Sequence, residues 1–205
     1  MSRARILADY VSSGDELALK APLASPTFTG TTNVSSGVTL PSNPTVTLGS
    51  NATFPAGHVV KVVNTQTGAM STGTTTMPHD NTIPQNTEGT EFMTLAITPT
   101  SATNKLLIQI IFSASHSVND DFLAALFQDT TANALSSTMI SRVNAAESTH
   151  GSFNHFMTSG TTSSTTFKLR IGSPASGTMT FNGVGGAARL GGSIASSITI
   201  LEIQV

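Results

Sequence analysis

The sequence predicts an all-β protein, with an antiparallel β-sandwich in its C-terminal part and an extended N-terminal part. Three observations carry this prediction. Short segments rich in Val, Ile, Leu and Phe recur along residues 58–205 at roughly 8–12-residue spacing. The turns between them are rich in Gly, Asn, Ser and Pro, and no long amphipathic helix is evident. Ten strands without helices therefore predict two packed antiparallel sheets.

Composition excludes several classes of protein. The 205 residues carry a formal net charge of -2, only 10% of them are charged, and there is no Cys. No disulfide framework or Cys metal site is possible, and no basic footprint for nucleic acid exists. No apolar run approaches the roughly 20 residues that span a bilayer, and the start lacks the apolar core of a secretory signal. We expect a protein made in the cytoplasm, with neither nucleic acid nor membrane as a partner.

Residues 1–20 are expected to be an anchor peptide. Four apolar residues fit one face of a short helix: Ile6, Leu7, Tyr10 and Val11. A helix of about two turns does not hold alone in water, so it needs a surface to bind or else frays. Arg3 and Arg5 either pair with carboxylates of a partner or remain a solvated terminal pair.

Residues 21–57 are expected to form an extended stalk. Pro and Gly recur throughout this stretch and block both helices and central strands. Its apolar residues are too widely spaced to bury a core in one copy. The stretch is either a flexible linker or a segment that packs against identical copies. Fully stretched, it reaches at most about 120 Å.

Residues 58–205 are expected to form one sandwich domain. The stretch 121–133 also fits helical spacing, but we assign its first part to a strand. Most of the Phe residues are expected in the core: Phe112, Phe122, Phe127, Phe153, Phe156, Phe167 and Phe181. The expected strands are 58–64, 69–77, 91–98, 104–115, 121–128, 136–143, 152–158, 165–172, 177–182 and 193–205.

Two of these strands, 106–112 and 198–203, are too apolar for a sandwich that stands alone. A strand with one face in water alternates apolar and polar residues, whereas these strands place apolar residues on both faces. We therefore expect self-association through them. The alternative is that loops or the 66–90 segment cover these faces. The expected packing residues are Leu107, Ile108, Ile110, Ile111, Ile198, Ile200 and Leu201.

No catalytic set emerges, so we expect a protein that is not an enzyme, with no catalytic residue, cofactor or bound metal. The pair His79-Asp80 lacks a nucleophile. The pair Asp120-Asp121 supplies too few oxygens for calcium by itself. His150 and His155 should face opposite sides of a strand, and the glycines of residues 183–186 fit a turn better than a phosphate loop.

Three stretches resemble proteins of tailed bacteriophages. Residues 19–30 read LKAPLASPTFTG, which resembles an element of many tailed-phage fibre proteins. Residues 57–63 (GHVVKVV) followed by 97–108 (ITPTSATNKLLI) resemble the opening of a phage knob domain. Residues 193–203 (SIASSITILEI) are similar to the closing strand of that domain. The first motif is the most specific of the three.

The resemblance implies a homotrimeric virion appendage. Its knob would be a jelly roll of the tumour-necrosis-factor-like kind, with three copies around an axis and the stalk formed by three extended chains. The stalk element occurs once here, which argues against a long reach. We expect a capsid decoration (cement or head-fibre) protein whose partners are itself and the major capsid protein. The alternative is a short tail fibre that binds a tail protein and a host surface receptor.

Overall fold

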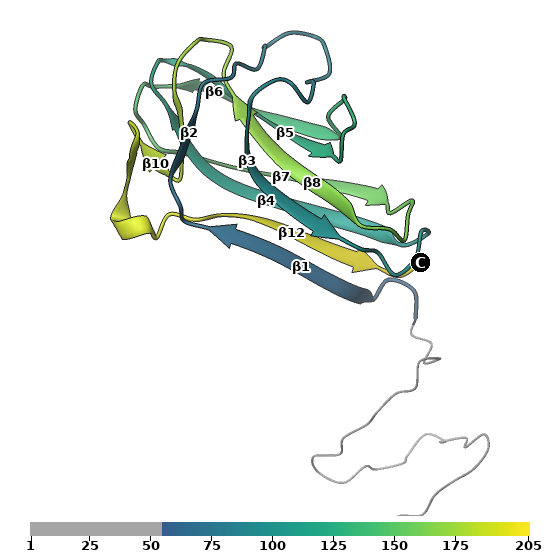
Figure 1. The fold of residues 1–205 in the computed structure, drawn as a ribbon. Helices are drawn as coiled ribbons and strands as arrows, with labels where there is room; N and C mark the ends of the chain where they lie inside the picture. Colours follow the sequence, from purple (N-terminus) through teal and green to yellow (C-terminus); the bar gives the residue numbers. More distant parts are fainter. Residues whose placement is uncertain (1–54) are drawn as a thin grey trace, which may run out of the picture. The chain divides into compact units, whose positions relative to one another are not determined.

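The computed structural model describes residues 55–205, which form two antiparallel sheets facing each other (Figure 1). Four strands make the body of the first sheet, in the order β1 (Val59–Thr67), β12 (Ser196–Ile203), β4 (Lys105–His116) and β7 (Thr149–Thr158). Two short strands extend it past the end of β12: β9 (Met179–Phe181), which pairs with the end of β4, and β2 (Ser71–Gly73). The second sheet has the order β3 (Thr90–Ile97), β8 (Thr165–Gly172), β5 (Asp120–Gln128) and β6 (Ser136–Val143). For residues 55–205 the expectation of an all-β fold with antiparallel sheets is confirmed.

The chain crosses from one sheet to the other at almost every connection. It runs from β1 to β3, back to β4, across to β5 and β6, back to β7, across to β8 and finally to β12. Two four-stranded sheets joined in this sequence have the strand order of a jelly roll. The first and last long strands lie side by side, since β1 pairs with β12 over most of its length (Figure 1).

The core lies between the sheets and is made by the inward-facing half of each alternating strand. In β12, buried residues alternate with partly exposed ones along the whole strand. Four of the expected core phenylalanines are fully buried here: Phe112, Phe122, Phe167 and Phe181. Two expectations need correction, because Phe156 points outward and is 58% exposed, and Phe127 belongs to a second cluster described next.

A second apolar cluster lies on the outer side of β5, under the connection from β2 to β3. Met77 of this connection is completely buried against Leu123, Ala125 and Phe127. Its backbone N–H donates to the carbonyl of Ser173 at 3.0 Å. The chain itself therefore covers the outer face of β5.

All ten expected strands are present; the bounds of 136–143 and 165–172 agree with the structure, and the ends of the others differ by one to several residues. The second is the most different, since only Ser71–Gly73 pairs and the following residues leave the sheet to cover β5. The expected turn at 183–186 is the tip of a small hairpin, β10 (Gly183–Val184) with β11 (Ala187–Ala188), which the sequence did not predict as strands. A 3-10 turn, η1 (Leu190–Gly192), follows it. Within residues 55–205 no helix has the length and hydropathy to cross a bilayer.

Candidate functional site

An apolar row crosses the outer face of the β1-β12-β4-β7 sheet. Val62 lies opposite Leu201, Leu201 opposite Leu107, and Leu107 opposite Phe156, so the four side chains line up from edge to edge. Val62 is 57% exposed and Phe156 is 58% exposed, while the two leucines between them are half-buried. Directly opposed side chains in antiparallel strands lie about 4.5–5.5 Å apart, so the row is continuous. We call these four residues the apolar row.

The neighbouring cross-strand rows on this face carry almost no charge. On one side lies a polar row, in which the Asn64 side chain donates to the Thr199 hydroxyl at 2.8 Å. Ile111, 54% exposed, lies in the row beyond it. On the other side Ile203 lies between Val59 and Lys105, whose ammonium group donates to Thr158 at 2.7 Å. Among the residues of these rows only Lys105 has a formal charge, so apart from this residue the face presents apolar and neutral hydrogen-bonding groups to any partner.

The seven residues expected at a packing surface are split by the structure. Four of them are buried in the chain's own core and cannot reach a second molecule: Ile108, Ile110, Ile198 and Ile200. That part of the prediction is wrong, because strand alternation turns these side chains inward. The other three point outward, and Leu107 and Leu201 belong to the apolar row, while Ile111 lies on the same face. The expected anchor residues lie outside the described part of the chain: Arg3, Arg5, Ile6, Leu7, Tyr10 and Val11.

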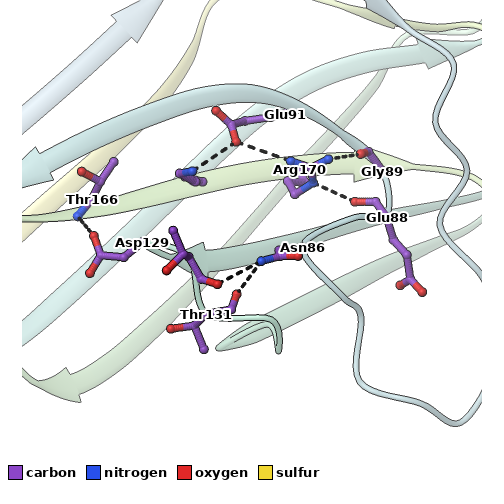
Figure 2. Close-up of polar contacts among 10 residues, drawn as sticks. Asn86, Glu88, Gly89, Glu91, Asp129, Thr131, Thr166 and Arg170 are labelled. Atoms are coloured by element: carbon purple, nitrogen blue, oxygen red, sulfur yellow. Dashed lines mark hydrogen bonds and ion pairs between the residues drawn. The ribbon is translucent and has the colours of Figure 1, made fainter.

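The outer face of the other sheet is charged along β3 and β8, and the chain itself covers it over β5. Figure 2 shows Arg170 of β8 donating to the carbonyls of Glu88 and Gly89, at 2.8 and 2.7 Å. Glu91 of β3 lies 3.4 Å from Arg170 and 3.7 Å from Lys168. These contacts hold the end of the β2–β3 connection against the sheet. The 66–90 segment does cover an outer face, as the alternative proposed, but it covers β5 rather than β4 and β12.

Sequence reasoning missed a buried carboxylate at one end of the sandwich. Glu202 is fully buried, and its Oε1 accepts hydrogen bonds from the Thr100 N–H, the Thr100 hydroxyl and the Asn104 amide at 2.7–2.8 Å. Burial raises the pKa of Glu202, but these hydrogen bonds together with a longer one from Ser101 outweigh it and hold the pKa below its ordinary value. Residues 97–108, one of the phage-like stretches, therefore include a loop folded around this carboxylate.

His79 and the Asp residues considered for chemistry have structural partners. His79 contacts Asp121 rather than its neighbour Asp80, with Nδ1 2.8 Å from Oδ2. The Asp120 carboxylate accepts from the Ser173 hydroxyl and the Ala175 N–H. His150 is exposed and His155 points inward, as expected for opposite sides of β7. In the described residues no group of three or more His, Asp or Glu is placed to hold a metal ion.

Comparisons with known proteins find neighbours among solved structures alone. No family model matches the sequence, and no curated protein matches it. A structure of the infectious bursal disease virus Gx strain is 12% identical, with 79% of this chain and 41% of that chain covered and a TM-score of 0.35. A bacteriophage CBA120 tailspike protein 4 domain is 14% identical, covering 62% of this chain and 20% of that chain, with a TM-score of 0.27.

A third neighbour is a structure titled for CBM4 structure and function, 12% identical, covering 44% of this chain and 56% of that chain with a TM-score of 0.32. The match thus spans about half or less of each of these solved chains. The neighbours include a viral capsid and a phage tailspike with β-rich folds. All three TM-scores are below 0.5, so no role for this chain follows from them.

Proposed function

We propose that this protein is a non-enzymatic structural component of a bacteriophage particle, and that it works as a homotrimer. The observation that carries the self-association is the apolar row on the outer face of the β1-β12-β4-β7 sheet. No residue in the described range 55–205 covers it, whereas the comparable apolar residues of β5 lie beneath the chain's own Met77. A contiguous exposed apolar patch with polar, nearly uncharged surroundings is typical of an interface.

The copies meet through this face. Complete burial of a Val or Phe side chain contributes about 1.5–3 kcal/mol, so burying the exposed part of Val62 and of Phe156 in each copy contributes roughly half of that per residue before entropic costs are counted. Low charge adds little repulsion between identical faces, because the chain carries a net charge of -2 and Lys105 is the one formal charge in the rows around Phe156. Three-fold closure rests on the resemblance to trimeric phage knobs.

Attachment to the particle is assigned to residues 1–20, and the short stalk to residues 21–57. The resemblance of residues 19–30 to phage fibre proteins supports a virion location. A single stalk element supports a position close to the shell, where the trimer would tie neighbouring capsid subunits together. Three anchors on one trimer bind together more tightly than one, through effective concentration. The fibre-type motif itself favours the second candidate, a short tail fibre that binds a host receptor.

Phage that lack the protein distinguish the two candidates. For a decoration protein we expect normal adsorption to the host and capsids that lose DNA at lower temperature or under milder osmotic shock. Complete loss of adsorption with capsids of normal strength would contradict the decoration role and favour the tail fibre.

Deleting residues 1–20 tests the anchor separately. We expect a soluble protein of unchanged oligomeric state that no longer joins particles when it is added to phage lacking the protein. Undiminished incorporation of the shortened protein would overturn the assignment of the anchor.

A further inference from the structure

A pocket of about 400 Å³ opens between the β2–β3 connection and the start of β6. Residues 80–84 form one wall and residues 134–137 form the other. This volume is near the low end of the range of about 300–1,000 Å³ found for small-molecule sites. The pocket is far in sequence and distinct in structure from the apolar row.

Hydrogen bonds fix the two walls to each other. The Ala134 N–H donates to the Pro84 carbonyl at 2.9 Å, and Gln85 and Asn133 form a β-bridge that their side chains reinforce at 3.0 Å. The Asn86 amide donates to the carbonyls of residues 130 and 131, as Figure 2 shows. At the other end of the wall the contact of His79 with Asp121 ties the connection to β5. The pocket is therefore largely formed before a ligand arrives, which lowers the entropic cost of binding.

The lining combines hydrogen-bonding groups with aliphatic ones. The Asp80 Oδ1 accepts from both the N–H and the hydroxyl of Thr82, at 2.8 and 2.5 Å, and this turn leaves Oδ2 for another donor. Those hydrogen bonds hold the pKa of Asp80 below its ordinary value, so the group is a carboxylate at neutral pH. Asn81 and Ser137 are exposed and offer an amide and a hydroxyl. Ile83 supplies an exposed aliphatic surface.

The charge of the lining excludes other classes of ligand. Residues 80–84 and 134–137 contain one carboxylate and no Lys, Arg or His, so a phosphate or carboxylate ligand would meet a like charge. A bound divalent cation such as calcium needs about 6–8 oxygen ligands, and one carboxylate among scattered hydroxyls does not supply them. A neutral polyol fits, because its hydroxyls donate to a carboxylate, accept from amides and hydroxyls, and leave C–H faces for aliphatic contact.

We propose that this pocket binds a neutral sugar unit of a glycan. Asp80 Oδ2 accepts a hydrogen bond from a sugar hydroxyl, Asn81 and Ser137 complete the polar contacts, and Ile83 packs against the ring. The proposal does not depend on the virion role or on the trimer, because every residue of the pocket comes from one chain.

The test is saturation-transfer NMR of the full chain with a panel of oligosaccharides. The neutral members are built from glucose, galactose, mannose and N-acetylglucosamine, and the anionic members are the same chains ending in sialic acid. We expect at least one neutral member to bind. Asp80→Asn keeps an oxygen for Thr82 but removes the charge, so it should weaken binding about ten-fold. Ser137→Trp, which fills the mouth of the pocket, should abolish binding.

Two matched controls separate the pocket from general effects. Ser141→Trp places the same ring on the same face of β6 outside the pocket, and Glu147→Gln neutralises an exposed carboxylate elsewhere. Both should bind like the wild type. The proposal is overturned if no neutral member binds, if binding survives Ser137→Trp, or if the sialylated members bind in preference to the neutral ones.

Discussion

Glu202 shows how one side chain fixes a loop that sequence patterns alone do not explain. Along β12 every second residue faces the core, among them Ile198 and Ile200. The same alternation turns the Glu202 carboxylate inward. It remains there because Thr100, Ser101 and Asn104 donate to it. Leu201 faces outward and Glu202 faces the core, which is the reverse of the usual placement of apolar residues inside and charged residues in water. A sequence pattern would have placed the charge in water, which is why this group was missed.

The lowered pKa of Glu202 predicts a stability that depends on pH. A carboxyl whose pKa in the folded state lies below its ordinary value of 4.5 stabilises the fold above about that pH. Below pH 4.5 the unfolded chain takes up a proton at this carboxyl before the folded chain does, which favours unfolding. The contribution is therefore lost as the pH falls from that value through the folded-state pKa. Glu202→Gln should lower the free energy of unfolding by about 1–3 kcal/mol at neutral pH.

Urea unfolding of the wild type and Glu202→Gln across the acidic range measures this. The difference between the two proteins should shrink as the pH falls below 4.5, because the unfolded wild-type chain then takes up a proton at Glu202 that the folded chain does not yet bind, and it is lost once the pH is below the folded-state pKa as well. A difference that is the same at neutral and acidic pH would show that the charge of Glu202 contributes nothing.

Gly151 is a second residue whose role is visible in the structure alone. It lies opposite Phe112 in the β4–β7 pair, and a Cβ placed on it would lie 2.3 Å from the Phe112 ring. Gly151→Ala should therefore displace a fully buried ring and destabilise the fold by about 1–3 kcal/mol. Ser152→Ala, an exposed neighbour, should change stability by less than about 0.5 kcal/mol in the same urea experiment. Equal effects of the two substitutions would contradict this role of Gly151.

At the scale of elements, the strands could be predicted from sequence but their faces could not. β4 has apolar residues at both alternating positions over most of its length, so nothing in the pattern says which set faces the core. The structure turns Ile108 and Ile110 inward and Leu107 and Ile111 outward. The pocket could not be predicted from the sequence for another reason. Its walls are joined by Gln85 and Asn133, which are loop residues, and no periodicity in the sequence relates the two positions.

The β2–β3 connection is expected to behave as part of the fold rather than as a loose loop. Met77→Ala leaves a cavity above Leu123 and Phe127, and it should lower the free energy of unfolding by about 2–5 kcal/mol. Met139→Ala, at a position that is 45% exposed on β6, should change it by less than about 0.5 kcal/mol. Urea unfolding of both variants measures these changes. If Met77→Ala lowers the free energy of unfolding as little as Met139→Ala does, the connection does not contribute to stability by covering the outer face of β5.

At the scale of the whole molecule, the chain covers the outer face of β5 in one sheet, and the other sheet presents the apolar row. A carboxylate buried in an interface without a partner costs far more than one on a free surface. Phe156→Asp should therefore give a monomer. Met139→Asp is the matched control, because Met139 is an exposed apolar residue on the other sheet. It should leave the oligomeric state unchanged, and loss of assembly in both variants would remove the row as the specific contact.

The mass of the wild-type chain in solution tests the central claim most directly. Light scattering at micromolar concentration should give three times the chain mass of 21.1 kDa, and Phe156→Asp should give the mass of one chain. A wild-type protein that stays at the mass of a single chain would contradict the account.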